Sequence, residues 1–168
     1  MVAVNTYLDD EKATLGLGAK LAALLIAEDG FGSDAVVFLR GELGAGKTTL
    51  VRGILRAFGF RGAVKSPTYT LLEPYDEYSV YHFDFYRIAD SRELEFIGVD
   101  EHMAAASIKL IEWPERARAH LPAPDIDVAL FVDGEGRRAE ICLPAGTVAA
   151  AAVLVAEDAQ DAPCVVSR

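Results

Sequence analysis

Eight consecutive residues carry the pattern G-x-x-x-x-G-K-[ST], which is typical of a phosphate-binding loop. The segment GELGAGKT fills every fixed position between Gly41 and Thr48. Its glycines allow the backbone to turn N–H groups inward, where side chains would block the approach of phosphate oxygens. Lys47 can reach the β- and γ-phosphates, and the Thr48 hydroxyl can ligate Mg²⁺. The residues predicted to bind the nucleotide are Gly41, Glu42, Leu43, Gly44, Ala45, Gly46, Lys47, Thr48 and Thr49.

Phosphoryl transfer at such a loop also requires a carboxylate near the metal, normally at the end of an apolar strand. Two acids meet this description, because Asp84 ends the segment VYHFD and Glu112 ends the segment IKLIE. Each could hold Mg²⁺, directly or through water, or orient the attacking water. Each is equally well explained as a solvated carboxylate at a strand end.

The elements around the loop are those that the motif requires. Ala35 to Leu39 is a continuous apolar run, as in a strand that is buried on both faces. Lys47 to Phe58 has apolar residues at helical spacing and is followed by Gly59 as a cap. An amphipathic helix is predicted over Glu11 to Glu28.

The rest of the pattern predicts a short helix with Ser91 as its cap and five strands. The helix spans Ser91 to Ile97. The strands span Thr68 to Pro74, Val80 to Asp84, Ile108 to Ile111, Ile126 to Val132 and Ala139 to Leu143. The fold class is therefore α/β, a single-domain P-loop NTPase with a mixed central sheet flanked by helices. The domain is expected over residues 1–146, with a helical or disordered tail over 147–168.

Charge and composition narrow the class of function. The 168 residues are 52% hydrophobic with a net charge of −10, which disfavours an unaided binder of nucleic acid. The range from Arg40 to Lys65 is the exception, with six basic residues and one acid, and a local positive charge suits a bound polyphosphate. Only Cys142 and Cys164 occur, so a reducing cytoplasm is expected. Neither a membrane span nor a homo-oligomer is predicted.

Four segments together resemble the TsaE family, formerly called YjeE. They are GELGAGKTT at Gly41, SPTY at Ser66, HFDFYR at His82 and LIEWPE at Leu110, in the order and at about the spacing of that family. The resemblance covers roughly residues 10–145. This chain departs from the family pattern at Tyr69, where Phe is common, and the exchange keeps the aromatic ring.

The resemblance implies an ATPase that works with TsaB-like and TsaD-like proteins to install threonylcarbamoyl on the adenosine beside the anticodon of certain tRNAs. It implies that tRNA is engaged through the complex, and that ATP hydrolysis resets or releases the complex between turnovers. It places Thr48, Asp84 and Glu112 around Mg²⁺ and Thr68 in a switch-like loop near the γ-phosphate. Lys47, Asp84, Glu112 and Thr68 are thus the expected catalytic residues, with ATP and Mg²⁺ as cofactors.

Two alternatives remain. A small-molecule kinase would need an arginine-bearing lid, whereas the span from Ser91 to Ala106 holds Arg92 as its only Lys or Arg and four acids. A nucleotide-gated binding module with little turnover would share the same loop. His82 is interpreted as a structural residue. Trp113 either abuts the nucleotide or a partner, or packs in the core.

Overall fold

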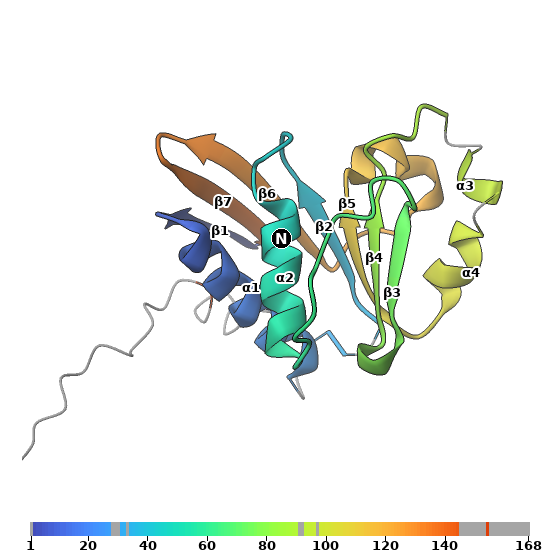
Figure 1. Cartoon of the computed structure of the whole chain (residues 1–168), viewed down its shortest axis with the longest axis horizontal. Helices are drawn as coiled ribbons and strands as arrows, with labels where there is room; N and C mark the ends of the chain where they lie inside the picture. The colour runs from blue at the N-terminus through green and yellow to red at the C-terminus, as the bar shows by residue number, and fades with distance from the viewer. Residues whose placement is uncertain are drawn as a thin grey trace, which may run out of the picture.

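A seven-stranded mixed sheet with the order β1-β7-β6-β2-β5-β4-β3 forms the centre of the molecule (Figure 1). The computed structural model describes residues 2–27, 31–32, 34–90, 93–96, 98–144 and 154. The strands are β1 Val2–Leu8, β2 Val36–Arg40, β3 Leu72–Tyr75, β4 Val80–Asp84, β5 Ile108–Glu112, β6 Ile126–Asp133 and β7 Gly136–Leu143. β2 pairs in parallel with both β5 and β6, β5 pairs in parallel with β4, and the pairs at both edges are antiparallel. The predicted mixed α/β sheet is confirmed.

Two long helices and several short ones accompany the sheet. The helices are α1 Glu11–Ile26, α2 Lys47–Ala57, α3 Glu93–Phe96 and α4 Val99–Ala104, with 3-10 turns at Asp76–Tyr78, Pro114–Arg116 and Arg118–His120. The Asp10 side chain caps α1 by accepting a hydrogen bond of 2.7 Å from the Ala13 N–H. Gly59 ends α2 with a φ of +106°, as the sequence predicts. None of the helices in the described ranges has the length and apolarity to cross a bilayer.

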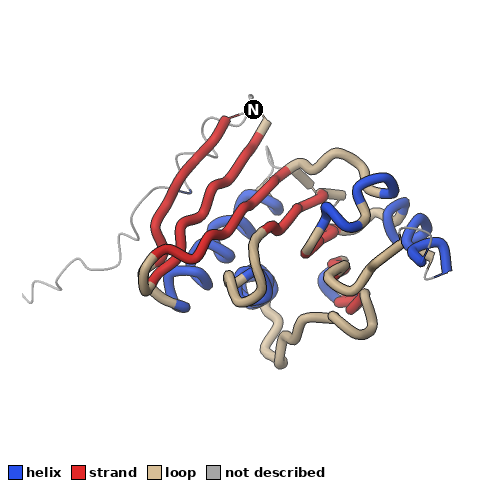
Figure 2. The backbone as a smooth tube through the Cα atoms, turned by 90° about the horizontal axis from the view of Figure 1, so that it is seen from above, coloured by secondary structure: helices blue, strands red, loops and turns tan. Residues whose placement is uncertain are grey.

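Each face of the sheet contributes to a separate apolar core. The larger core lies under α1 and α2 and includes Leu21, Leu50 and Val128, whereas the smaller one includes Phe38, Phe83 and Ile111. Viewed from above, the long strands occupy one half of the molecule and the short helices gather at the other (Figure 2). The strands between the two cores are buried on both faces, which explains their continuous apolar sequences.

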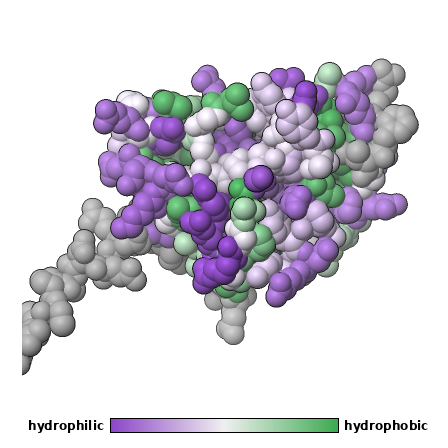
Figure 3. Space-filling model, in the orientation of Figure 1, coloured by the Kyte–Doolittle hydropathy of each residue, from purple (hydrophilic) through white to green (hydrophobic). Residues whose placement is uncertain are grey.

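α1 and α2 cross in close contact. A Cβ atom on Gly18 would lie 2.6 Å from the Leu50 carbonyl oxygen, and one on Gly53 would lie 2.5 Å from that of Leu15. Hydrophilic side chains dominate much of the outward surface near these helices (Figure 3). The crossing fixes the direction of α2, and therefore of the loop before it, against α1.

Several predicted elements differ from those found. The strand predicted from Thr68 begins only at Leu72, because the Leu71 N–H bonds to the Pro67 carbonyl and Leu71 has a φ of +64°. Tyr69, where the family commonly has Phe, is 85% exposed and lies outside both cores. Two elements, β1 and α4, have no counterpart in the prediction. Ser91 and, apart from Leu154, the predicted tail over 147–168 lie outside the described residues.

Candidate nucleotide-binding site

The loop between β2 and α2 has the backbone conformation that its glycines predict. Gly41, Gly44 and Gly46 have φ values of +136°, +81° and +106°, which side-chain-bearing residues rarely adopt. A Cβ atom on Gly41 would also lie 2.4 Å from the Leu130 carbonyl oxygen of β6. This loop is therefore seated against the neighbouring strand at a point where only glycine fits.

Lys47, the first residue of α2, is folded back over the loop. Its Nζ donates hydrogen bonds to the carbonyls of Gly41 at 2.7 Å and Glu42 at 2.9 Å. The same ammonium lies 4.3 Å from the centre of the Trp113 ring. Burial lowers the pKa of Lys47, while the negative charges of Glu112 and Asp84 oppose that shift. The side chain is thus a cation held at the loop by backbone oxygens and an aromatic face.

The two predicted acids lie side by side. β4 and β5 are parallel and in register, so Asp84 and Glu112 are direct partners at the carboxyl ends of their strands. Their exposed fractions are 2% and 3%. The Thr48 hydroxyl donates a hydrogen bond of 2.8 Å to Glu112 Oε1. Glu112 therefore faces the start of α2, and the alternative of two solvated strand-end carboxylates is wrong.

Asp84 is held by a different set of donors. Its Oδ2 accepts hydrogen bonds from Thr68 Oγ1 at 2.8 Å and from the Ser66 hydroxyl. Its Oδ1 accepts one from the Tyr86 N–H at 2.9 Å. The segment that contains Ser66 and Thr68 is therefore tied to the end of β4 through a single carboxylate, which brings the second and third sequence motifs together.

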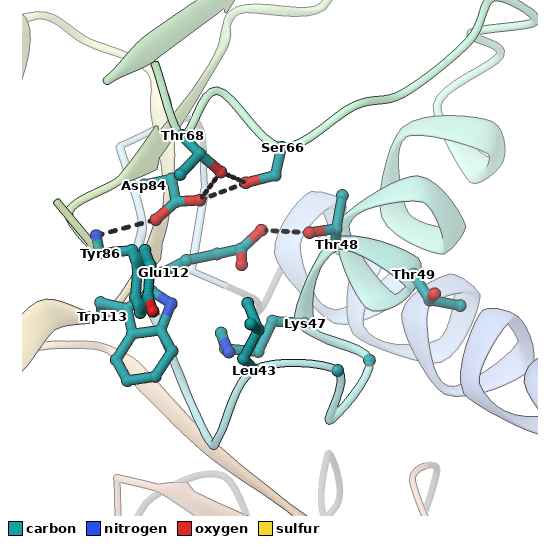
Figure 4. A pocket seen from close by; sticks show the side chains of 12 residues that line it. Leu43, Lys47, Thr48, Thr49, Ser66, Thr68, Asp84, Tyr86, Glu112 and Trp113 are labelled. Atoms are coloured by element: carbon teal, nitrogen blue, oxygen red, sulfur yellow. Dashed lines mark hydrogen bonds between the residues drawn. The ribbon is translucent and has the colours of Figure 1, made fainter. Parts of the chain in front are cut away.

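These residues line one pocket of about 240 Å³ (Figure 4). Its lining is Leu43, Gly44, Gly46, Lys47, Thr48, Thr49, Ser66, Thr68, Asp84, Tyr86, Glu112 and Trp113. All four expected catalytic residues are among them. Figure 4 shows Thr49 directed away from the carboxylates, whereas Thr48 points at Glu112.

Three predicted loop residues do not line this pocket. The carbonyls of Gly41 and Glu42 bond to Lys47, and Ala45 is buried with its N–H bonded to the Glu42 carbonyl at 3.1 Å. These three residues shape the loop through contacts within it and do not face the pocket.

Two aromatic side chains outside the predicted set of site residues also line the pocket, and one of them is Trp113, for which a position beside the nucleotide was one of the alternatives. The rings of Tyr86 and Trp113 lie 5.0 Å apart at an interplanar angle of 51°. Trp113 has a φ of +57°, and its N–H bonds to the Leu39 carbonyl at 3.3 Å. Each lies within two residues of one of the acids, in the segments HFDFYR and LIEWPE.

The donor set fits Mg²⁺. Mg²⁺ prefers oxygen ligands and is commonly held by one or two carboxylates together with the phosphates of a substrate. The Thr48 hydroxyl and the carboxylates of Asp84 and Glu112 supply such oxygens around one pocket. Within the described part of the chain, no three His, Cys, Asp or Glu side chains form a cluster that would hold a metal by themselves.

Comparison with known proteins shows the family of the chain. The family model described as "Threonylcarbamoyl adenosine biosynthesis protein TsaE" matches residues 8–139. The chain belongs to the TsaE family. The match includes the loop, both acids and the segment that contains Thr68.

Individual relatives extend the comparison. The chain is 43% identical over 143 residues to the tRNA threonylcarbamoyladenosine biosynthesis protein TsaE of Haemophilus influenzae, covering 84% of this chain and 90% of that one. It is 37% identical to the protein of the same name from Treponema pallidum, over 62% of this chain and 78% of that one. The crystal structure of Bacillus subtilis YdiB has the same fold, with a TM-score of 0.70 and 22% identity over 91% of this chain and 94% of that one.

Proposed function

We propose that this chain is a Mg²⁺-dependent ATPase that serves the formation of threonylcarbamoyladenosine in tRNA. The observation that carries the proposal is the pairing of Asp84 with Glu112 at the strand ends, facing Lys47 and Thr48 across one pocket. A glycine loop with a lysine binds phosphate, and adjacent carboxylates supply what hydrolysis of a nucleoside triphosphate needs in addition. Membership of the TsaE family supports the role in tRNA modification.

The chain's own residues divide the chemistry between them. Inward N–H groups of the loop and the start of α2 bind the phosphates. The Lys47 ammonium exchanges its backbone carbonyls for phosphate oxygens and stabilises the charge that develops on the γ-phosphate. Thr48 with Asp84 or Glu112 would hold Mg²⁺, which would supply Lewis-acid stabilisation. The remaining carboxylate, or Thr68, positions water for in-line attack.

A second pocket beside the loop favours a nucleotide as the ligand over a simple phosphate ester, because it offers space for a nucleoside. This pocket of about 200 Å³ lies beside the loop and includes Thr14 of α1 and Arg137 of β7. Gly44, Gly46 and Thr49 line both pockets. A ligand with its γ-phosphate near Glu112 would pass Thr49 and reach this second space with its nucleoside. We place the ribose and base of ATP there.

The proposed partners are TsaB-like and TsaD-like proteins, with tRNA engaged through their complex. In this scheme, partner chemistry transfers the threonylcarbamoyl group, and ATP hydrolysis by this chain resets or releases the assembly between turnovers. Such an ATPase is expected to turn over slowly alone and faster in the complex.

The function is tested by the rate of ATP hydrolysis of Lys47→Ala with partners present. Loss of the ammonium removes a charge-stabilising contact and should lower the rate by about 10²–10³-fold. Lys12→Ala, at an exposed position of α1, is the matched control and should hydrolyse ATP at the wild-type rate. Hydrolysis by Lys47→Ala at the rate of the control would sink the proposal.

A further inference from the structure

One buried side chain beside the pocket has no place in the chemistry above. His82 of β4 has an exposed fraction of 0%, and its Nε2 lies 2.9 Å from Glu112 Oε1. Its other ring nitrogen, Nδ1, is buried and has no hydrogen-bond partner within the described residues. A buried polar atom without a partner destabilises a fold, so this histidine is a costly choice for a position among the apolar side chains of a central strand.

The contact with Glu112 accounts for that choice. An ionised carboxylate only accepts hydrogen bonds, so the ring nitrogen that faces it carries the hydrogen. Placing the hydrogen on Nδ1 instead would bury an unpaired donor and turn the Nε2 lone pair toward a carboxylate oxygen. The geometry therefore favours the tautomer in which Nε2 donates to Glu112 and Nδ1 is bare.

Two donors converge on the same oxygen of Glu112. Thr48 Oγ1 lies 2.8 Å from Oε1, and His82 Nε2 lies 2.9 Å from it. Figure 4 shows the other carboxylate oxygen on the side of the pocket that holds Lys47. If Thr48 ligates a metal ion through a lone pair of its hydroxyl oxygen, its O–H can still donate to Glu112, and His82 is the donor of this pair that is not itself a metal ligand.

We infer that His82 is a positioning residue, which holds the Glu112 carboxylate in place when Thr48 ligates Mg²⁺. The inference rests on the proposed function, because it concerns the metal-bound state of that site. His82 is not among the residues that line the pocket. Its hydrogen bond limits the Glu112 carboxylate to one orientation, as such partners do for many metal-ligating groups.

Two substitutions of His82 distinguish the effect of losing its hydrogen-bond donor from the effect of losing the volume of its ring. The side-chain amide of Gln reaches about as far as Nε2 of His, whereas that of Asn reaches only as far as Nδ1. His82→Gln therefore keeps a donor within reach of Glu112, and His82→Asn removes it. His102→Asn is the matched control, since His102 is only partly buried and lies edge-on to Tyr81, 4.9 Å between ring centres, on the other face of the sheet.

The measurement is binding of a fluorescent ATP analogue, titrated with Mg²⁺ from a metal-free state. We expect His82→Asn to raise the Mg²⁺ concentration for half-maximal tightening by about 10–100-fold, the usual cost of losing such a partner. Its affinity in EDTA should stay at the wild-type value, because the phosphate contacts are intact. His82→Gln and His102→Asn should titrate close to wild type.

The outcomes are distinct. A wild-type Mg²⁺ titration of His82→Asn, or equal impairment of His82→Gln and His82→Asn, overturns the positioning role. Absence of analogue binding by the wild type at any Mg²⁺ concentration overturns the proposed function itself.

A second measurement uses the wild type and so does not depend on whether a variant folds. The ¹⁵N–¹H correlation spectrum of the histidine rings should show the Nε2–H tautomer for His82, before and after addition of Mg²⁺ and ATP. An Nδ1–H tautomer in either state contradicts the inference.

Discussion

Asp84 accepts hydrogen bonds from two hydroxyls and one backbone N–H, and these contacts fix where its charge lies in the pocket. All three donors belong to residues that line the pocket, and Thr68 is the most informative because it alone among them is an expected catalytic residue. Thr68 can act in two ways: its hydroxyl can hold Asp84 in place through a hydrogen bond, or it can position the attacking water.

Thr68→Val removes the hydroxyl and keeps the shape of the side chain. If Thr68 positions water or fixes Asp84 for hydrolysis, kcat should fall by about 10–100-fold, a cost in the range of one lost hydrogen bond to a charged group. KM for ATP should change little, because the phosphate contacts remain. Steady-state kinetics measures both, with Thr70→Val at an exposed site as control. A rise in KM with unchanged kcat would instead assign Thr68 to ATP binding.

The lowered pKa of Lys47 should make the stability of the fold depend on pH. Burial lowers its pKa in the folded state below the unfolded value of 10.5, so the folded state binds this proton more weakly. The wild type should therefore gain stability relative to Lys47→Met as pH rises from the lowered pKa toward 10.5. Urea unfolding of both proteins between about pH 7 and 10.5 measures the difference. A difference that is constant or shrinks with pH would contradict the assigned cause.

The site residues were predictable where chemistry restricts residue type. A glycine loop, its Lys and Thr, and acids at strand ends follow from what phosphate and Mg²⁺ require. The contacts that hold Asp84 were not predictable without the family resemblance, because nothing local tells Ser66 and Thr68 from ordinary turn residues. The contact between His82 and Glu112 depends on the register of β4 and β5, which one sequence does not reveal.

At the scale of elements, the crossing of α1 and α2 sets the direction of α2 and so positions the phosphate loop that precedes it. Gly18 and Gly53 allow the two backbones to approach, since a Cβ on Gly18 would lie 2.8 Å from the Gly53 Cα. The start of α2, where Lys47 and Thr48 lie, is thus positioned by contacts further along both helices.

Gly18→Ala should destabilise the protein by about 1–3 kcal/mol, because overpacking forces the helices apart despite the better helix propensity of Ala. The measurement is the free energy of unfolding in urea. Ala19→Ser enlarges the neighbouring exposed residue of α1 and should change stability by less than about 0.5 kcal/mol. Equal stability of Gly18→Ala and wild type would show that the crossing tolerates a methyl group.

Elements with strong periodicity or a motif were predicted well, and the others were not. α2 and the strands β2 and β5 have clear apolar patterns because they lie beside or between the cores. β1 is an edge strand with only Val4 and Leu8 buried, so its apolar pattern is sparse. The segment from Thr68 has β-forming residues, but a hydrogen-bonded turn between Pro67 and Leu71 overrides that local preference.

At the scale of the whole molecule, the candidate site lies where the carboxyl ends of three parallel strands meet. β2, β5 and β4 are consecutive in the sheet and end in the phosphate loop, Glu112 and Asp84. Because these strands pack between two cores, they position the two carboxylates and the start of the loop more precisely than loops alone would. This arrangement agrees with the general rule that ligands bind beyond the carboxyl ends of strands in α/β sheets.

The most direct test is the rate of ATP hydrolysis by the purified chain, alone and then with TsaB-like and TsaD-like proteins and tRNA, for wild type and Glu112→Ala. We expect the partners to stimulate turnover of the wild type and to have no such effect on Glu112→Ala, because that variant lacks one of the two paired carboxylates. Turnover that the partners leave unchanged, or equal stimulation of Glu112→Ala, would contradict the account of a partner-driven ATPase that uses this site.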